Sequence, residues 1–222
     1  WGKIPLQTSQ RLNGIWGSGP RDVHVVGGNG VVLHYDGASW SQSSYGETLE
    51  LTSIWGPSAK ARFAAGFGGM IIRHDGQAWT RQSSGPTAGL RAIWGSGGVV
   101  YAAGFSGTIL RNDGTGWSEQ SSGTTAALYG LWGSAAADVF AVGQGGAVVH
   151  HDGKAWTKMA SGVSGTLRGV WGSAPNAVHA VGDSGTIARY DGTIWTKVSS
   201  GVTQTLHAVW GTGPKDVYAV GD

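Results

Sequence analysis

Aspartates followed by glycine are the most conspicuous residues of this chain that could do chemistry. They occur five times, each four residues before a tryptophan, as Asp36, Asp75, Asp113, Asp152 and Asp191. A carboxylate array of this kind could bind cations or transfer protons. Asp-Gly is also a dipeptide that tolerates the positive φ of a tight hairpin turn. The regular spacing favours this structural role over a catalytic one.

Histidine offers the second candidate chemistry. His150 and His151 are adjacent, but neighbours on a strand point to opposite faces and cannot chelate one metal ion. Other histidines share one repeat position with aromatic residues, which favours packing in the wedge between neighbouring repeats. That position holds His24, Phe63, Tyr101, Phe140, His179 and Tyr218. The sequence therefore predicts no metal site, no cofactor and no catalytic residue, and the protein is expected not to be an enzyme.

Two sets of residues vary where the rest of the repeat is constant. One set lies three residues before a Trp-Gly pair and comprises Asn13, Thr52, Arg91, Tyr129, Arg168 and His207. The other lies in glycine-flanked turns and comprises Gly28, Phe67, Phe105, Gln144, Asp183 and Asp222. Charged and aromatic side chains around a concave surface bind polar ligands by hydrogen bonding and stacking. The candidate ligand-binding residues are Arg91, Tyr129, Arg168, His207, Phe67, Phe105, Gln144 and Asp183. Drift at surface positions is the alternative explanation.

Tryptophan reveals the framework that must position these side chains. All 12 tryptophans occupy two positions of one repeat, at spacings of 38 or 39 residues. One series precedes glycine and comprises Trp16, Trp55, Trp94, Trp132, Trp171 and Trp210. The other comprises Trp1, Trp40, Trp79, Trp117, Trp156 and Trp195. A constant period near 40 residues indicates a repeat architecture.

Each repeat contains four short β-rich segments separated by Gly, Asp, Asn, Ser or Pro. No ten-residue helical stretch lies between them, so the pattern predicts antiparallel strands. Four strands in about 40 residues are typical of a β-propeller blade. On the first strand, a leucine, a small residue and the Trp-Gly tryptophan are expected to share one face, because side chains alternate along a strand. The small residue suits the crowding expected near a central axis.

The two ends of the chain are expected to supply strands of one further blade. Trp1 occupies a fourth-strand position, and Asp222 follows a second strand. We therefore predict a single all-β domain over residues 1–222, with five complete repeats and a split sixth that lacks one strand. The expected fold is a six-bladed β-propeller of four-stranded antiparallel blades, closed by a composite "velcro" blade from both termini. Closure of this kind leaves few open strand edges.

Composition excludes several classes of partner. The net charge of +2 and the absence of a basic run argue against nucleic-acid binding. No stretch approaches about 18 apolar residues, so no membrane span is expected. The chain has no cysteine, which fits export without disulfides and fits the cytosol equally. A monomer or weak oligomer is expected.

The repeat resembles a known type of propeller blade. In the fifth copy the pattern reads Val181-Gly182, Gly185-Thr186-Ile187 and Asp191-Gly192 with Trp195. These residues resemble bacterial Trp-Gly and Tyr-Asp-Gly-x-x-Trp propeller repeats, and are distantly similar to the Asp-box repeats of sialidase-like and photosystem-assembly-factor propellers. The resemblance implies the blade scaffold and a secreted or cell-surface protein, with the cytoplasm as the alternative. Sialidase catalysis would need an arginine triad, a Tyr-Glu pair and a further acid. Only Glu47, Glu50 and Glu119 are available as glutamates, so no catalytic residue is carried over.

Three classes of function make different structural predictions. A binding module or lectin would have shallow pockets at equivalent repeat positions, a scaffold would have one flat face, and an enzyme would have a unique catalytic constellation. We predict a non-enzymatic binding or scaffold propeller with a glycan or protein partner, carbohydrate being the candidate ligand. The alternatives are a structural, designed or recently amplified repeat protein without a specific ligand, and a sialidase-like glycan hydrolase.

Overall fold

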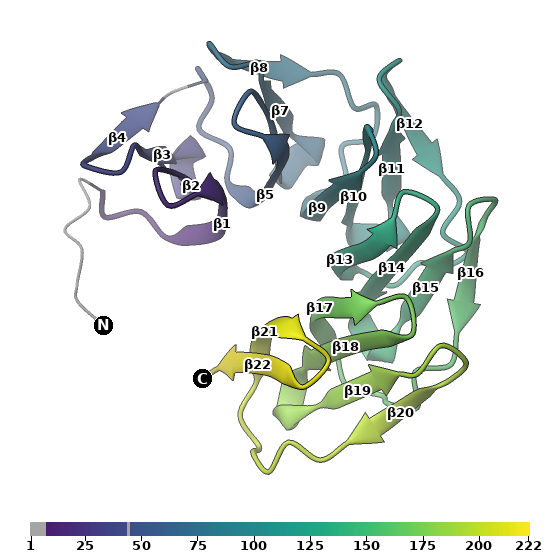
Figure 1. The fold of residues 1–222 in the computed structure, drawn as a ribbon. Helices are drawn as coiled ribbons and strands as arrows, with labels where there is room; N and C mark the ends of the chain where they lie inside the picture. The colour runs from purple at the N-terminus through teal and green to yellow at the C-terminus, as the bar shows by residue number, and fades with distance from the viewer. Residues whose placement is uncertain (1–7, 44) are drawn as a thin grey trace. The chain divides into compact units, whose positions relative to one another are not determined.

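The computed structural model describes residues 8–43 and 45–222. These residues form β-strands joined by tight turns, and the helical segments among them are five 3-10 turns of three residues each. No helix in this part of the chain is long and apolar enough to cross a membrane. The all-β prediction is confirmed (Figure 1).

The strands form five four-stranded sheets and one two-stranded sheet, numbered here in chain order. Sheet 1 contains β1 (Leu12–Gly19), β2 (Asp22–Gly27), β3 (Val32–Tyr35) and β4 (Trp40–Ser43). Sheet 2 contains β5 (Leu51–Ser58), β6 (Ala61–Gly66), β7 (Ile71–His74) and β8 (Trp79–Gln82). Sheet 3 contains β9 (Leu90–Ser96), β10 (Val99–Gly104), β11 (Ile109–Asn112) and β12 (Trp117–Gln120).

The remaining sheets repeat the same order. Sheet 4 contains β13 (Leu128–Ala135), β14 (Asp138–Gly143), β15 (Val148–His151) and β16 (Trp156–Met159). Sheet 5 contains β17 (Leu167–Ala174), β18 (Ala177–Gly182), β19 (Ile187–Tyr190) and β20 (Trp195–Val198). Sheet 6 contains only β21 (Leu206–Gly213) and β22 (Asp216–Gly221). The 3-10 turns join second to third strands and are η1 (Gly28–Gly30), η2 (Phe67–Gly69), η3 (Phe105–Gly107), η4 (Gln144–Gly146) and η5 (Asp183–Gly185).

The chain divides into two compact units, residues 1–93 and 94–222, with the boundary inside β9. Sheets 1 and 2 belong to the first unit, and sheets 4 to 6 to the second. A single domain and a count of six blades remain predictions. The composite blade also remains a prediction, because Trp1 lies outside the described residues.

A β-bulge in the first strand corrects one expectation. Leu12 pairs with Gly27 while Gly14 pairs with Val26, so Asn13 is an extra residue in the strand. The same shift occurs in β5, β13, β17 and β21. An extra residue breaks the alternation of side chains. The prediction that the leucine shares a face with the tryptophan is therefore wrong. In sheet 2, Leu51 packs against Val26 and Trp16 of the preceding sheet.

In sheets 4, 5 and 6, the glycine of the Trp-Gly pair makes room for a tryptophan of the preceding sheet. A Cβ at Gly172 would lie 2.6 Å from Trp132, and a Cβ at Gly211 would lie 2.8 Å from Trp171. In the second unit the first strands β13, β17 and β21 lie side by side (Figure 1). A Cβ at Gly169 would lie 3.1 Å from the Ala208 Cα, so the expected crowding along the first strand is confirmed.

Aromatic residues of the second strand fill the space between consecutive sheets, as predicted. Phe140 is fully buried, and its ring centroid lies 5.2 Å from that of Tyr190 and 5.7 Å from that of Trp195. Tyr101 makes the equivalent contacts with His151 and Trp156.

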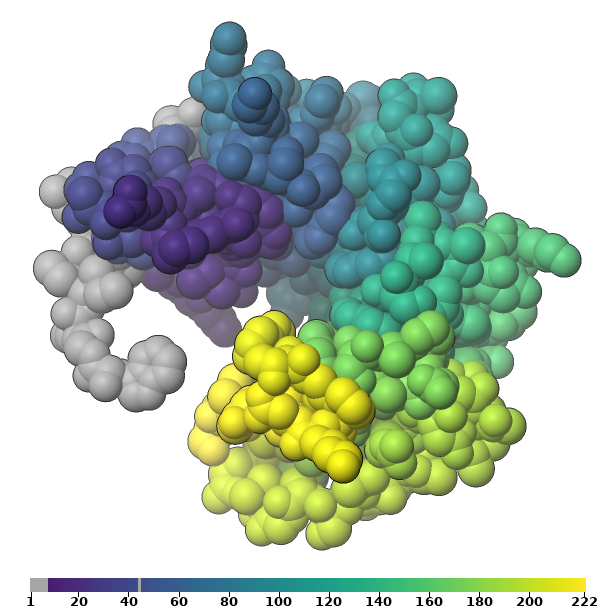
Figure 2. Space-filling model, viewed as in Figure 1, coloured from purple at the N-terminus to yellow at the C-terminus, as the bar shows by residue number. Residues whose placement is uncertain are grey.

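In sheet 6, the face that carries the second-strand aromatic residue is exposed to solvent, since no further sheet of its unit packs against it. Trp210 is 59% exposed and Tyr218 is 61% exposed. Figure 2 shows this C-terminal surface in yellow.

Candidate functional site

The bulge gives the variable residues of the first strand their special position. Asn13, Thr52, Tyr129, Arg168 and His207 are each the extra residue of a bulged strand. Bulges re-aim side chains and are frequent beside functional sites. The variable turn residues begin the 3-10 turns, and η1, η3, η4 and η5 each contact the first strand of the following sheet. We call the eight candidate ligand-binding residues the bulge–turn set.

Members of the bulge–turn set contact one another in pairs. Arg168 Nε donates a hydrogen bond to Asp183 Oδ1 at 2.6 Å within sheet 5. The rings of Phe105 and Tyr129 meet edge to face at 6.4 Å between centroids. In the first unit, the guanidinium of Arg91 lies over the ring of Phe67 at 5.5 Å.

The other two members have different neighbours. His207 Nε2 lies 2.9 Å from Asp222 Oδ1, a turn residue outside the set. Gln144 begins η4, and its backbone N–H donates to the carbonyl of Ala127 at 2.8 Å. The structure thus joins six of the eight candidates into three pairs.

Two bulge residues outside the set have a structural role. Asn13 Nδ2 donates to the carbonyl of Leu51, and Thr52 Oγ1 donates to the carbonyl of Leu90. Both bonds tie a first strand to the residue that begins the next one. An Asn or Thr at the bulge position therefore links two consecutive sheets by a hydrogen bond.

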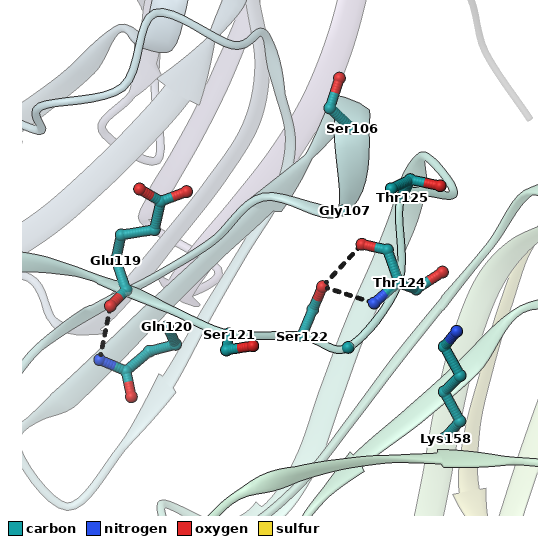
Figure 3. A pocket seen from close by; sticks show the side chains of 10 residues that line it. Ser106, Gly107, Glu119, Gln120, Ser121, Ser122, Thr124, Thr125 and Lys158 are labelled. Atoms are coloured by element: carbon teal, nitrogen blue, oxygen red, sulfur yellow. Dashed lines mark hydrogen bonds between the residues drawn. The ribbon is translucent and has the colours of Figure 1, made fainter.

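A polar hollow of about 390 Å³ lies beside η3 (Figure 3). Its lining comprises Ser106, Gly107, the segment from Glu119 to Thr125, and Lys158. Figure 3 shows Glu119 and Lys158 on opposite sides of it. Ser122 is buried and accepts a hydrogen bond from the backbone N–H of Thr124, which fixes the loop. Gly107 has φ +70°, and a Cβ there would clash with the Thr124 carbonyl, so glycine lets loop and turn meet.

A second hollow of about 370 Å³ lies at the equivalent place in sheet 2. Its lining includes Gly68, Gly69 and the segment from Arg81 to Thr87, which correspond position by position to the residues around η3. Each lining contains one glutamine at the same repeat position, Gln82 in sheet 2 and Gln120 in sheet 3. Sequence reasoning missed these hollows, because it placed the candidate site at the first strands and the glycine-flanked turns and not at the loops that follow the fourth strands. The signal was the recurrence of Gln-Ser-Ser-Gly.

A buried polar network in the first unit was also missed. His24 is 3% exposed and Arg62 is 5% exposed, although Arg62 occupies a repeat position that otherwise holds valine. Asp22 Oδ1 lies 2.8 Å from His24 Nε2 and accepts a hydrogen bond from Arg62 Nη1 at 3.2 Å. The second terminal nitrogen of the Arg62 guanidinium, Nη2, lies 2.9 Å from His74 Nδ1. The sequence signal was a charged residue replacing a core valine.

Burial governs the protonation of this network. Burial lowers the pKa of His24 from 6.5 to about 4, with the Arg62 charge acting in the same direction. Burial likewise lowers the pKa of His74, again with a contribution from Arg62. Desolvation by itself raises the pKa of Asp22, but hydrogen bonds from Ser18 and His24, together with the charge of Arg62, lower it overall. At neutral pH the two histidines are therefore uncharged beside an Asp–Arg ion pair.

The Asp-Gly aspartates are turn residues, as predicted. Asp36 Oδ1 accepts hydrogen bonds from the backbone N–H groups of Ala38 and Ser39 at 2.8 Å each. Asp75, Asp152 and Asp191 repeat the pattern. These backbone bonds lower the pKa of each carboxyl.

The remaining candidates for catalysis are dispersed. Glu47 accepts a hydrogen bond from Arg81, and Glu50 accepts one from Asn13. His150 contacts Asp138 and Phe140 of its own sheet, whereas His151 contacts Tyr101 of sheet 3. The prediction that the adjacent histidines point to opposite faces is confirmed.

Comparisons with known proteins identify the fold. No family model and no curated protein sequence matches the chain. Among solved structures, YCF48 bound to a D1 peptide is similar with a TM-score of 0.76 and 17% identity, over 100% of this chain and 78% of that one. YCF48 from Cyanidioschyzon merolae is similar with a TM-score of 0.56 and 14% identity, over 100% of this chain and 96% of that one. The chain thus consists of sheets packed like propeller blades, in a fold that resembles YCF48.

Proposed function

We propose that this protein is a non-enzymatic binding propeller that recognises carbohydrate through repeated polar hollows. The observation that carries the proposal is the equivalence of the two hollows at η2 and η3. A ligand built from repeating units meets the same chemistry at both hollows, and linked contacts raise avidity without new interactions. We further propose that the propeller has six blades.

The linings suit a polyhydroxylated ligand. Amide and hydroxyl side chains both donate and accept hydrogen bonds. Gln120 and Ser121 supply such groups at one hollow, and Gln82 and Ser83 at the other. Sheets 1, 4 and 5 carry Ser43, Met159 and Val198 at the glutamine position, which confines this glutamine to sheets 2 and 3. The aromatic pair Phe105–Tyr129 adjoins the hollow beside η3, because Phe105 begins that turn, and it offers a stacking surface.

A glycan array with the full chain tests this proposal. We expect binding to be lost in a Gln82→Ala/Gln120→Ala variant and kept in Gln77→Ala, a control at the Asp75–Gly76 turn on the opposite end of sheet 2. We also expect Arg168→Ala and Phe105→Ala to weaken binding by about 1 kcal/mol or more each if the bulge–turn set contributes. An array without hits, or hits that survive the glutamine double variant, would contradict the carbohydrate assignment.

Peptide binding is the second candidate. It is favoured by the similarity to YCF48, whose structure is described as bound to a D1 peptide. Here the ion pair Arg168–Asp183 and the aromatic pair Phe105–Tyr129 would contact the peptide. Selection from a random peptide phage library tests it. This candidate would be favoured if the selected peptides no longer bind the Arg168→Ala variant but still bind the glutamine double variant.

A further inference from the structure

Three side chains of one hairpin in sheet 1 converge on one face. His24 on β2 and His34 on β3 are directly opposite partners in the strand register. Asp22 lies two residues before His24 on the same strand and therefore points to the same side. One carboxylate and two imidazoles thus meet within a single hairpin.

The donor atoms lie close enough to share one ion. His24 Nε2 is 2.8 Å and His34 Nε2 is 3.0 Å from Asp22 Oδ1, and all three atoms lie within 4.8 Å of one another. A tetrahedral zinc ion with bonds of about 2.0–2.2 Å holds its ligand atoms roughly 3.3–3.5 Å apart. The ligands would need to separate by only a few tenths of an ångström. The imidazole rings, now stacked at 4.2 Å and 4° between planes, would also need to tilt.

His34 gives the site the freedom and the access that this tilt requires. Its side chain is 34% exposed, whereas the side chain of His24 is only 4% exposed. The more exposed side of the site is therefore the β3 side. His24 Nδ1 has no hydrogen-bond partner among the described residues, so it can carry the ring proton when Nε2 binds a metal.

From these observations we infer a site for one divalent transition-metal ion, bound by Asp22 Oδ1, His24 Nε2 and His34 Nε2. The two imidazoles are borderline donors that select Zn²⁺, Ni²⁺ or Cu²⁺ over Mg²⁺ and Ca²⁺, and a carboxylate also binds zinc beside histidine. The fourth position is left to water. The site is independent of the polar hollows and of the bulge–turn set.

Arg62 tunes this site from sheet 2. Its Nη1 lies 3.2 Å from the same Asp22 oxygen that binds the metal, so the guanidinium repels a divalent ion and competes for its ligand. Replacement of Arg62 by a neutral side chain of similar length should therefore strengthen metal binding. We expect Arg62→Met to bind Zn²⁺ at least ten times more tightly than the native chain.

Sheet 4 supplies a matched control within the same protein. Asp138 and His150 occupy the repeat positions of Asp22 and His34, and their side chains lie 2.6 Å apart. Phe140 replaces the second histidine and stacks on His150 at 4.3 Å. Two ligands without a third should not hold the ion, so only sheet 1 is expected to bind.

Isothermal titration of the untagged full chain with Zn²⁺ tests the inference, with Co²⁺ absorption as a second readout of the ligands. We expect one saturable site, at least a tenfold loss of affinity in His34→Ala, and no change in His150→Ala. Circular dichroism verifies that both variants are folded. Mg²⁺ at the same concentrations should give no binding heat.

Three outcomes would overturn the inference. One is the absence of saturable Zn²⁺ binding to the native chain. Another is retention of full affinity in His34→Ala. The third is an equal loss of affinity in His150→Ala. If His34→Ala fails to fold, His34→Gln, which keeps the size of the side chain, takes its place with the same expectations.

Discussion

The contact between sheets 1 and 2 and the contact between sheets 4 and 5 use the same repeat positions for opposite chemistry. In sheet 4, Phe140 packs against Tyr190 of sheet 5. The equivalent residues of sheets 1 and 2 are the histidines His24 and His74, and His74 contacts Arg62. Val178 is fully buried at the position that Arg62 takes in sheet 2. The repeat therefore sets the geometry of the interface, while individual residues decide whether it is apolar or ion-paired.

The difference has an energetic consequence. Burial of apolar surface stabilises a fold directly. A buried ion pair must first offset the desolvation of its charges, and losing one partner is costly. The contact between sheets 4 and 5 should accordingly dominate stability, whereas the contact between sheets 1 and 2 should respond to pH.

The largest effect is expected from Phe140→Ala. Removal of this fully buried ring leaves a cavity between Val178, Tyr190 and Trp195, and should lower the free energy of unfolding by about 3–5 kcal/mol. Chemical denaturation measures the change. His24→Ala in sheet 1 should lower the free energy of unfolding by less, because removing the imidazole also removes the penalty of burying a polar ring. Equal losses for the two variants would break the comparison.

The pH dependence of stability should come next in size. The buried His24 stays neutral down to about pH 4 in the folded protein, whereas an unfolded histidine is protonated below about pH 6.5. Unfolding therefore takes up a proton, and the free energy of unfolding should fall by up to about 3 kcal/mol as the pH drops through this window.

The variant His24→Phe, which copies the residue of sheet 4, isolates this contribution. Denaturation in buffer containing EDTA, at pH 7 and pH 4.5, should show a smaller pH dependence for the variant than for the native chain. Identical pH profiles would show that His24 does not carry the effect.

A smaller loss is expected from Gly172→Ala. The added Cβ would lie 2.6 Å from the rigid ring of Trp132, and such overpacking costs about 1–3 kcal/mol. Ser173→Ala, beside it and exposed, is the matched control. Calorimetry of the two variants should show a lower melting temperature only for Gly172→Ala.

The smallest effect is expected from Arg168→Ala. The side chains of Arg168 and Asp183 are 36% and 33% exposed, so solvent screens their ion pair. Its removal should change the free energy of unfolding by less than about 1 kcal/mol. A larger loss in thermal unfolding would show that the bulge–turn set is structural, which would weaken its assignment to ligand binding.

Much of the candidate site could be placed from the sequence, but its chemistry could not. The turn residues were located correctly because Gly-x-x-Gly marks the turn in each of the first five repeats. The pairing of Arg168 with Asp183 or of Phe105 with Tyr129 was not foreseeable, because it depends on how a bulged strand approaches a neighbouring turn. The hollows at η2 and η3 likewise arise from loop and turn meeting in space.

The sequence by itself determined the repeat, the strand order and the Asp-Gly turns, because these depend on local backbone preferences and on a period visible in the tryptophans. Only the tertiary structure decided which face each leucine takes and which polar residues meet. A single extra residue at Asn13 reverses the leucine, and Arg62 reaches Asp22 across 40 positions of sequence. Such contacts depend on the packing of one sheet on the next, which no local pattern encodes.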